Sequence, residues 1–234
     1  MSRLPDGTGR PEVFHSIQGE GVYAGRPAAF LRLASCNLAC TWCDTRYTWD
    51  WARYDREKET VAMPSADVEL AIVRFGCRSL VVTGGEPLLQ QGELVPLLER
   101  LKGGGFWIEV ETNGTILPDE RLAGVIDHWS VSPKLASSGN PPASREKPEA
   151  YRHFSRLPSA HFKYVVEGPE DLEEIGLLSA RYHIPRGRVI LMPQAGESAQ
   201  LLEKGRWLAD ICVREGFLFS TRLQVLLWGQ RRGM

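Results

Sequence analysis

Three of the chain's five cysteines lie close together in the segment CNLACTWCDT, residues 36–45. The spacing is C-x3-C-x2-C, with thiols at Cys36, Cys40 and Cys43. Thiols grouped in this way are typical ligands of a metal ion or cluster, or take part in redox chemistry. The N-terminal residues lack the apolar stretch of a signal peptide, so we expect a cytoplasmic protein. Because cytoplasmic thiols stay reduced, the cluster of cysteines is not expected to form disulfides.

Zinc and an iron–sulfur cluster are the two candidates for this loop. Structural zinc usually takes four protein ligands, often as two C-x2-C pairs, and no second pair is present. Cys77 and Cys212 are isolated, and we interpret both as buried helix residues. His15 could complete a zinc site, but no pattern singles it out. Three thiolates fit a [4Fe–4S] cluster better, because each binds one iron and the fourth iron stays open for a substrate or cofactor.

Short apolar runs, many rich in β-branched or aromatic residues, predict the strands that position this loop. They span residues 28–34, 79–83, 106–112, 128–132, 161–166, 188–192 and 222–228. Helix-favouring stretches lie between most of them, at residues 66–76, 87–102, 169–183 and 198–216. Leu97, Leu98 and Leu101 predict a helix face buried against a sheet, and Gly216 predicts a helix end. The segment 137–148 is rich in Ser, Pro and Gly and predicts a surface loop.

Strands that alternate with helices predict an α/β fold with a mainly parallel sheet. The sheet could be doubly wound or a partial barrel, and both bind ligands at the carboxyl ends of the strands. Polar motifs follow successive predicted strands: CNLACTWCDT (36–45), TGGEP (83–87), ETNG (111–114), SPK (132–134) and MPQ (192–194). We therefore expect these motifs to converge on one pocket. There, Gly84 and Gly85 would let the backbone approach a ligand, and Glu86 could accept hydrogen bonds from an ammonium group.

Composition excludes several classes of protein. The 234 residues suit a single domain, 1–234, whose core needs no disulfides. A formal net charge of −1 argues against broad binding to nucleic acid or a membrane surface. No apolar run approaches the length of a transmembrane helix. We therefore predict neither a nucleic-acid nor a membrane partner.

The cysteine spacing followed by GGEP resembles the radical S-adenosylmethionine (SAM) superfamily. More specifically, FHSIQGEGVYAGRPAAFLRLASCNLACTWCDT, residues 14–45, looks like the 7-carboxy-7-deazaguanine synthase family. Members of that family open with S-x-Q-G-E-G, continue with a G-x-P-x-x-F-x-R strand, and end the cluster loop in W-C-D-T. TGGEP, ETNG, SPK, MPQ and a C-terminal RLQVLLWGQRRG follow in the family's order. The resemblance thus covers nearly the whole chain.

The resemblance implies a lyase that converts 6-carboxy-5,6,7,8-tetrahydropterin to 7-carboxy-7-deazaguanine with loss of ammonia, for queuosine-type deazapurine biosynthesis. It implies a shortened, modified radical SAM partial (β/α) barrel that is usually a homodimer. The implied cofactors are a [4Fe–4S] cluster, S-adenosyl-L-methionine and Mg²⁺, with an electron donor of the flavodoxin or ferredoxin type. A radical made from S-adenosylmethionine would take hydrogen from C6 of the pterin, and S-adenosylmethionine would be regenerated in each turnover.

The resemblance also assigns residues to the substrate and to Mg²⁺. Ile17, Gln18 and Gly19 match the segment that contacts the pterin, and Thr83 matches a further substrate contact. Arg32 matches the arginine that pairs with the substrate carboxylate, which a planar guanidinium can bind bidentately.

Thr45 matches a threonine whose hydroxyl ligates Mg²⁺ beside the substrate, and this hard ion also accepts substrate oxygens and water. The residues that match the S-adenosylmethionine and cluster environment are Trp42, Cys43, Asp44, Gly85, Ser132, Pro133, Lys134, Met192, Pro193, Gln194 and Ala195. Glu20, Glu111 and Asn113 are expected in the pocket without an assigned role. Lys163 is equally compatible with a place in the pocket and with a structural role.

Two other functions stay open at this point. An activase that installs a glycyl radical on a partner enzyme shares C-x3-C-x2-C but lacks the Q-G-E-G opening. A zinc- or cluster-binding module acting on RNA is disfavoured by the near-neutral charge and by the lack of an aromatic and basic RNA motif. The segment 46–64, with Trp49, Trp51 and Tyr54, is compatible with covering the pocket, docking a partner protein or packing.

Overall fold

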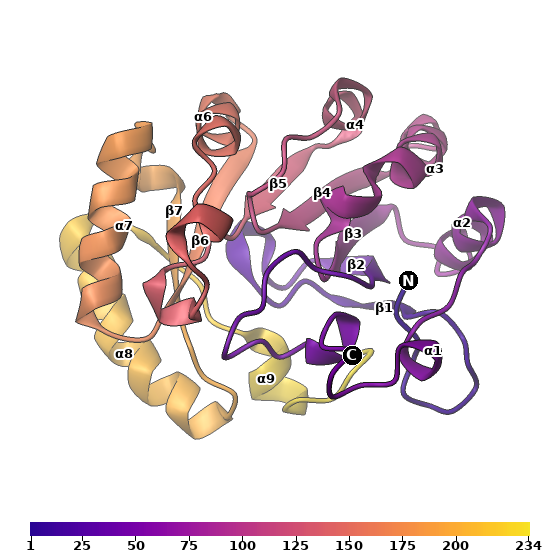
Figure 1. The fold of residues 1–234 in the computed structure, drawn as a ribbon, viewed down its shortest axis with the longest axis horizontal. Helices are drawn as coiled ribbons and strands as arrows, with labels where there is room; N and C mark the ends of the chain where they lie inside the picture. Colours follow the sequence, from indigo (N-terminus) through magenta and orange to yellow (C-terminus); the bar gives the residue numbers. More distant parts are fainter.

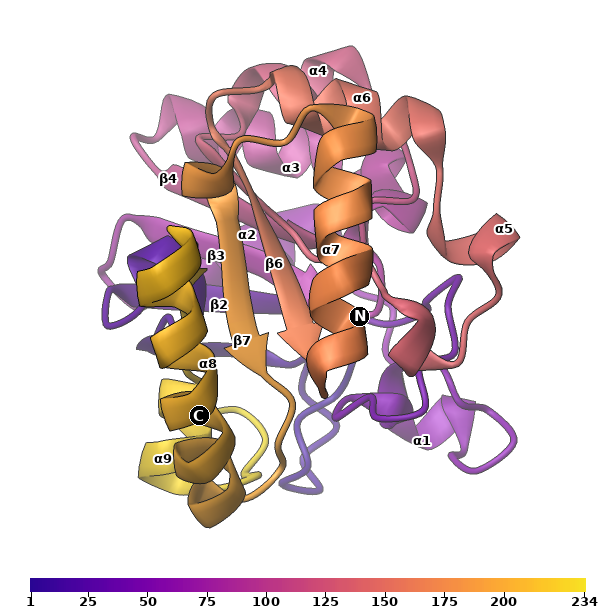
Figure 2. The same cartoon turned by 90° about the vertical axis from the view of Figure 1, so that its left-hand side faces the viewer.

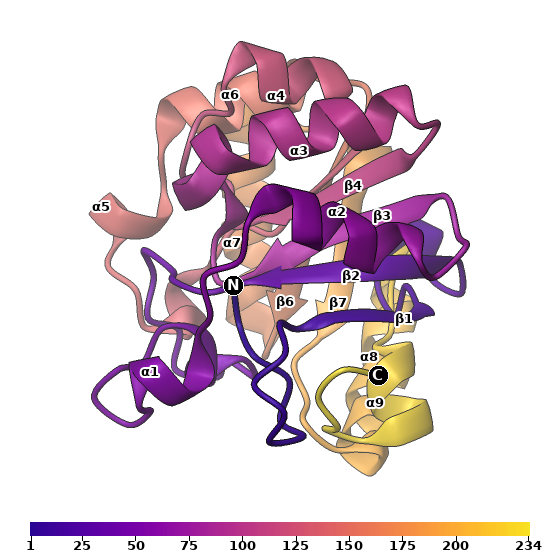
Figure 3. The same cartoon turned by 90° about the vertical axis from the view of Figure 1, so that its right-hand side faces the viewer.

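The computed structural model describes all 234 residues and contains one sheet of eight strands. The strands are β1 (Val13–Ile17), β2 (Pro27–Leu33), β3 (Ser79–Gly84), β4 (Trp107–Thr112), β5 (His128–Val131), β6 (Ala160–Val166), β7 (Val189–Pro193) and β8 (Leu218–Phe219). They lie next to one another in sequence order. β1 is antiparallel to β2, as the opposed arrows in Figure 3 show, and each later strand is parallel to the one before it.

Helices connect the parallel strands. The α-helices are α1 (Arg56–Glu59), α2 (Ser65–Val73), α3 (Gln91–Gly103), α4 (Glu120–Val125), α5 (Pro142–Arg145), α6 (Pro148–Arg156), α7 (Pro169–Tyr182), α8 (Ser198–Glu215) and α9 (Leu223–Trp228). Short 3-10 helices are η1 (Gly21–Tyr23), η2 (Arg46–Thr48), η3 (Pro87–Gln90), η4 (Ala136–Ser138) and η5 (Arg186–Arg188). None of the helices is both long enough and apolar enough to cross a membrane.

The strand order decides between the two sheet architectures that the sequence allowed. A doubly wound sheet reverses its strand order at one point, whereas this sheet adds every strand on the same side of the last. Because parallel crossovers are right-handed, such an order places the connecting helices on one face. In Figure 1 the sheet curves, and α2, α3, α4, α6, α7 and α8 surround its outer face. The fold is therefore a partial (β/α) barrel with a shortened, mainly parallel sheet, as expected.

Side chains of the strands alternate between the helix-facing side and the barrel interior. Ile108 and Val110 of β4 are fully buried in the main core, which joins the sheet to the surrounding helices. Their neighbour Glu111 faces the interior and lines the cavity described below. The predicted helix face of Leu97 and Leu98 is buried in the same core. The main apolar layer therefore lies between the sheet and its helices, while the barrel interior holds polar side chains such as Glu111 beside a small apolar cluster of Phe14, Ala28, Phe30 and Val81.

Six of the seven predicted strands are confirmed, and none of their ends differs from the prediction by more than one residue. The seventh prediction, a strand at 222–228, is wrong because Leu223–Trp228 forms α9. The run of apolar residues there is short, and a short apolar run does not distinguish a strand from a helix by its periodicity. The antiparallel strand β1 and the two-residue strand β8 were not predicted, and neither were α4 and α6. Figure 2 shows α9 at the end of the molecule toward which β6 and β7 point.

Two further expectations need correction. The segment 137–148 contains α5 and the first residue of α6, and its Asn140 is buried, so it is more than a surface loop. Cys77 lies in the connection before β3 and is half-buried, whereas Cys212 is buried in α8 as expected. Gly216 ends α8 with φ of 77°, the left-handed conformation that glycine adopts without steric cost.

Candidate active site

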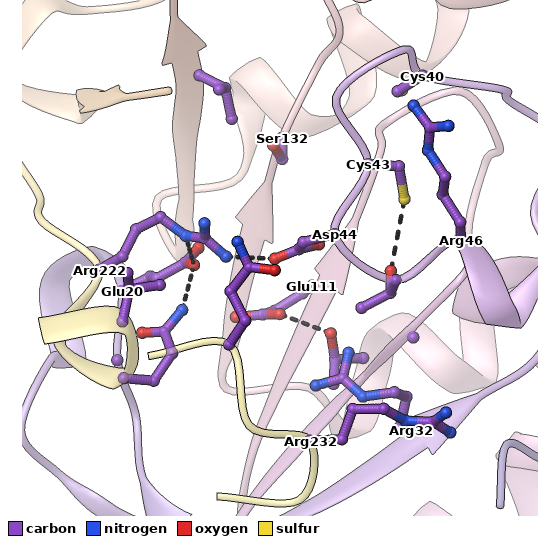
Figure 4. Close-up of a pocket in the computed structure, with 18 of the residues that line it drawn as sticks. Glu20, Arg32, Cys40, Cys43, Asp44, Arg46, Glu111, Ser132, Arg222 and Arg232 are labelled. Carbon is purple, nitrogen blue, oxygen red and sulfur yellow. Dashed lines mark hydrogen bonds and ion pairs between the residues drawn. The ribbon is translucent and has the colours of Figure 1, made fainter. Parts of the chain in front are cut away.

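A cavity of about 560 Å³ lies at the carboxyl ends of the parallel strands. All five polar motifs contribute to its wall, so the expected convergence on one pocket is confirmed. The predicted residues that line it are Ile17, Gln18, Gly19, Arg32, Cys36, Cys40, Trp42, Cys43, Asp44, Thr45, Thr83, Gly85, Ser132, Lys134, Met192, Pro193, Gln194 and Ala195. Pro133 is the exception and does not line the cavity. Figure 4 shows several of these side chains directed toward one space.

The cysteine loop leaves the end of β2 and folds across the mouth of the barrel. The Thr41 amide donates to the Ser138 carbonyl over 3.0 Å, and the Cys43 amide donates to the Cys40 carbonyl over 3.2 Å. Cys40 is buried, while Cys36 and Cys43 are half-buried. Burial raises the pKa of the Cys36 thiol to about 11.

The glycines of TGGEP serve a close approach between backbone segments. A Cβ at Gly85 would lie 2.0 Å from the Ser35 carbonyl oxygen, and one at Gly84 would lie 2.1 Å from the Leu33 carbonyl oxygen. The Gly85 amide donates to Leu33, and the Glu86 amide donates to Ser35. These contacts hold the end of β3 against the start of the cysteine loop. The approach seen here is therefore to the protein's own backbone, whereas the sequence suggested a ligand.

Glu86 has a different role from the one the sequence suggested. Its carboxylate is fully buried and lies outside the cavity wall. Oε1 accepts hydrogen bonds from the Leu88 amide at 3.0 Å and the Thr112 hydroxyl at 2.8 Å, and Oε2 accepts one from the Asn113 amide at 2.7 Å. Both oxygens are thus engaged within the protein. Glu86 joins the turn after β3 to the turn after β4 and does not offer an acceptor to a bound ammonium group.

Arg32 on β2 is held by a buried carboxylate behind it. Its Nε donates to Oε1 of Glu12 at 3.1 Å, and the Tyr47 hydroxyl donates to the same oxygen at 3.1 Å. No protein partner engages the two terminal nitrogens of Arg32, which lines the cavity. This orientation suits a ligand carboxylate, because the free end of the guanidinium can donate two parallel hydrogen bonds.

Thr83, Glu111 and Gln18 form one wall of the cavity. The Thr83 hydroxyl donates to Oε2 of Glu111 at 2.6 Å, and Nε2 of Gln18 donates to Oε1 of Glu111 at 3.2 Å. Lys163 Nζ lies 3.9 Å from the same Oε1. This wall presents carboxylate, amide and hydroxyl groups, which can recognise the donor and acceptor edge of a heterocycle.

Glu20 is the centre of a buried ionic network that shares Lys163 with this wall. Lys163 Nζ lies 2.5 Å from Oε2, while Arg222 Nε and Gln224 Nε2 lie 3.1 Å and 2.7 Å from Oε1. Burial alone would raise the pKa of Glu20, but the Lys163 and Arg222 charges outweigh it and hold the pKa well below its usual range. Arg222 also pairs with Asp44 of the cysteine loop (Figure 4).

The remaining motifs complete the rim. The Lys134 ammonium donates to the Ser132 carbonyl and hydroxyl, at 2.8 Å and 2.9 Å, and lies 5.7 Å from the centre of the Trp42 ring. The Thr45 hydroxyl lies 3.6 Å from Sγ of Cys43. Thr45 is therefore next to a candidate cluster ligand, on the cavity side of the loop.

Comparison with known proteins identifies the chain's relatives. The profile of the Radical SAM superfamily matches residues 32–178, which is more than half of the chain. A 7-carboxy-7-deazaguanine synthase of Pyrobaculum aerophilum is 38% identical over 231 residues, covering 95% of each chain. One of Hyperthermus butylicus is 37% identical over 225 residues, covering 92% of this chain and 91% of the relative.

The chain belongs to the 7-carboxy-7-deazaguanine synthase family of radical SAM enzymes.

A solved structure agrees with this membership. The crystal structure of QueE from Escherichia coli superposes with a TM-score of 0.68 and 27% sequence identity, covering 91% of this chain and 92% of that chain. Membership implies a [4Fe–4S] cluster and S-adenosylmethionine as cofactors. The cysteine loop fits such a cluster, because its three thiols line one cavity and a cluster takes one thiolate on each of three irons. His15 is exposed on β1 and does not line the cavity, so it does not complete a zinc site.

Several cavity residues of this family member were not predicted. Arg222, Gln224 and the C-terminal residues 229–234 line the cavity, but α9 was predicted as a strand and its approach to Glu20 is set by the tertiary structure. Phe14 and Phe30 stack with ring centres 5.0 Å apart and form an apolar part of the wall. The GQRRG sequence after α9 was a usable signal, because it is part of the C-terminal motif RLQVLLWGQRRG of the family resemblance.

Proposed function

We propose that this protein is a 7-carboxy-7-deazaguanine synthase, a lyase that converts 6-carboxy-5,6,7,8-tetrahydropterin to 7-carboxy-7-deazaguanine with loss of ammonia. Such a product is used in the biosynthesis of queuosine and related 7-deazapurines. The observation that carries the proposal is the shared cavity, where three cysteine thiols face the same space as Arg32 and the Thr83–Glu111 wall. Family membership supports the same reaction.

We assign the residues that would bind the two cofactors from among those that line the cavity. Cys36, Cys40 and Cys43 would hold the cluster, leaving one iron open. Gly85, the segment Ser132–Lys134 and the segment Met192–Ala195 would contact S-adenosylmethionine, with Trp42 and Asp44 beside them, although Pro133 itself stands outside the cavity wall. When bound, the reduced cluster and S-adenosylmethionine supply a radical that removes hydrogen from substrate.

The chain's own residues orient the substrate. Arg32 would bind the pterin carboxylate through its two free terminal nitrogens, because Glu12 already engages Nε and fixes the guanidinium plane. The Gln18–Glu111–Thr83 wall would accept and donate hydrogen bonds along the amide edge of the ring, together with Ile17 and Gly19. Holding both ends of the substrate limits the geometries it can adopt in the reaction.

Thr45 is proposed as the protein ligand of Mg²⁺. Its hydroxyl faces the cavity next to Cys43, and a single protein oxygen with substrate oxygens and water is a normal shell for this ion. Further proposals are a single domain over 1–234 and a cytoplasmic location and, from the family resemblance, a homodimer and a flavodoxin- or ferredoxin-type electron donor.

The direct test is anaerobic turnover. The protein is reconstituted with iron and sulfide, then mixed with dithionite, S-adenosylmethionine, Mg²⁺ and 6-carboxytetrahydropterin, and the products are read by mass spectrometry. We expect 7-carboxy-7-deazaguanine with S-adenosylmethionine largely retained, and no product from Cys40→Ala. Cleavage of S-adenosylmethionine without this product would refute the substrate. Stoichiometric accumulation of 5'-deoxyadenosine would instead favour the glycyl-radical activase.

A further inference from the structure

Each of the three candidate cluster thiols receives a hydrogen bond from a different side-chain N–H group. Asn140 Nδ2 lies 3.2 Å from Sγ of Cys40, and Trp49 Nε1 lies 3.3 Å from Sγ of Cys43. Asn113 Nδ2 lies 3.9 Å from Sγ of Cys36, a weaker contact. The donors come from three separate parts of the chain: the loop after β5, the turn after the cysteine loop, and the end of β4.

The side chain of Asn140 is fixed so that its NH₂ group faces sulfur. Its Oδ1 accepts a hydrogen bond from the Ala39 amide at 2.9 Å, which only an oxygen can do. Its Nδ2 also donates to the Ser138 hydroxyl at 3.1 Å. The residue is buried, so no competing water is needed to satisfy the amide. The orientation of the donor toward Cys40 therefore follows from the protein around it.

Trp49 is the donor whose direction is least ambiguous among the three. An indole has one N–H group and no acceptor, so its contact with Cys43 can only be a donation to sulfur. Trp49 caps the C-terminus of the 3-10 helix η2, where its backbone amide donates to the Arg46 carbonyl at 3.0 Å. This contact gives the segment 46–64 a specific connection to the cysteine loop.

Asn113 is oriented in the same way as Asn140. Its Oδ1 accepts hydrogen bonds from the Thr115 amide at 3.0 Å and hydroxyl at 2.6 Å, which directs Nδ2 away from Thr115. Nδ2 donates to Oδ1 of Asn37 at 2.8 Å, and its contact with Cys36 is the longer of the two. Asn113 is therefore the weakest of the three sulfur donors.

We propose that Trp49, Asn140 and, more weakly, Asn113 are positioning residues that raise the reduction potential of the [4Fe–4S] cluster through N–H···S hydrogen bonds. Reduction adds negative charge to the cluster and its thiolates, and an N–H dipole aimed at sulfur stabilises the reduced form more than the oxidised form. The inference rests on the cluster assignment made under the proposed function. It predicts that a donor closer to its sulfur has a larger effect on the reduction potential than a more distant one.

The test is a redox titration of the reconstituted enzyme, monitored by the electron paramagnetic resonance signal of the reduced cluster. Trp49→Phe removes the N–H group and keeps an aromatic ring. Trp51→Phe is the matched control, because this nearby indole has no contact with sulfur. We expect Trp49→Phe to lower the equilibrium constant for one-electron reduction by about tenfold, which corresponds to about 59 mV. Trp51→Phe should match the wild type.

A second pair of variants keeps the proposal testable if Trp49→Phe folds poorly. Asn140→Ala should shift the midpoint in the same direction by a similar amount, and Asn113→Ala should shift it less. Midpoints equal to that of Trp51→Phe in both Trp49→Phe and Asn140→Ala would overturn the proposal. A variant that keeps its melting temperature but binds no iron would show that its donor is needed to hold the cluster, which would also overturn a role limited to the potential. A wild-type enzyme without a [4Fe–4S] signal would refute the cluster itself, so the two failures are distinguishable.

Discussion

Arg222, next to the last helix, forms an ion pair with Asp44 of the cysteine loop, although 178 positions separate them in the sequence. The same guanidinium donates through Nε to Glu20 at 3.1 Å. Arg222 therefore ties three segments of the cavity wall together: the Q-G-E-G element, the cysteine loop and the C-terminal segment. It lies largely out of solvent, with 13% of its side chain exposed.

Loss of this connection should destabilise the protein and disturb its cavity. Arg222→Gln removes one partner of a buried pair, and we expect the free energy of unfolding to fall by about 3 kcal/mol. Urea unfolding of the reconstituted enzyme measures the change. Arg206→Gln, at an exposed position of α8 without an ion pair, is the control and should differ from the wild type by less than about 0.5 kcal/mol. Equal stability of the two variants would contradict the structural role of Arg222.

Arg32→Lys should weaken binding of the pterin substrate. A lysine cannot donate two parallel hydrogen bonds to a carboxylate, so we expect KM to rise by about tenfold or more. Steady-state kinetics with the reconstituted enzyme measures this, with Arg10→Lys in an exposed loop as the control. A substrate analogue without the carboxyl group provides the decisive comparison. If Arg32→Lys weakens binding of that analogue as strongly as it weakens the natural substrate, the carboxylate contact is wrong.

Thr45→Ala should reduce turnover and raise the Mg²⁺ concentration needed for half-maximal activity by about tenfold, because a metal-ligating oxygen is lost. The cluster spectrum should stay intact, since Thr45 contributes no sulfur ligand. Thr45→Ser keeps the hydroxyl and should restore most of the Mg²⁺ response. Turnover measured against Mg²⁺ concentration distinguishes the variants. An unchanged Mg²⁺ dependence in Thr45→Ala would remove this residue from the metal site.

Gly85→Ala should be poorly tolerated for a reason unrelated to ligand binding. The added Cβ would lie 2.0 Å from the Ser35 carbonyl oxygen, so the backbone of the cysteine loop must move. We expect a loss of about 3 kcal/mol or more in the free energy of unfolding. Gly92→Ala is the matched control, because nothing lies within 4 Å of the added Cβ on α3. That variant should gain up to about 1 kcal/mol, and a loss as large as that of Gly85→Ala would contradict the steric argument.

His161 should make stability depend on pH. Burial, then His128, then Arg188 lower the pKa of His161 to about 4 from its ordinary value of 6.5. The unfolded chain therefore binds this proton at a higher pH than the folded protein does. The free energy of unfolding should fall as the pH falls from 6.5 toward 4.

The measurement is urea unfolding across that pH window. His161→Gln should show a weaker dependence than the wild type, while His15→Gln, at an exposed position of β1, should retain it. Identical slopes for His161→Gln and the wild type would rule out His161 as a source of the dependence.

Residue pattern alone predicted much of the fold and the site. Strands β2 to β7 were recognised as short apolar runs, many of them rich in β-branched or aromatic residues, and helices α2, α3, α7 and α8 as the helix-favouring stretches between them. The cysteine spacing identified the cluster loop, because its three ligands are close in sequence. The polar motifs were expected at one pocket, since the carboxyl ends of parallel strands lie at one edge of a sheet. These features are local, and local features can be read from the chain.

Contacts between distant segments were decided only by the tertiary structure. Glu86 joins two turns and is not a ligand contact, Arg222 reaches Glu20 and Asp44, and Asn140 of a supposed surface loop reaches Cys40. The side chain of a glutamate, arginine or asparagine is equally suited to solvent, to the protein or to a ligand. Its role is set by which groups the folded backbone brings within hydrogen-bond distance, because a buried polar group must find a partner. The sequence by itself therefore determined the cofactor loop and a mainly parallel sheet, and only the tertiary structure decided that the sheet forms a partial barrel and which side chains support that loop.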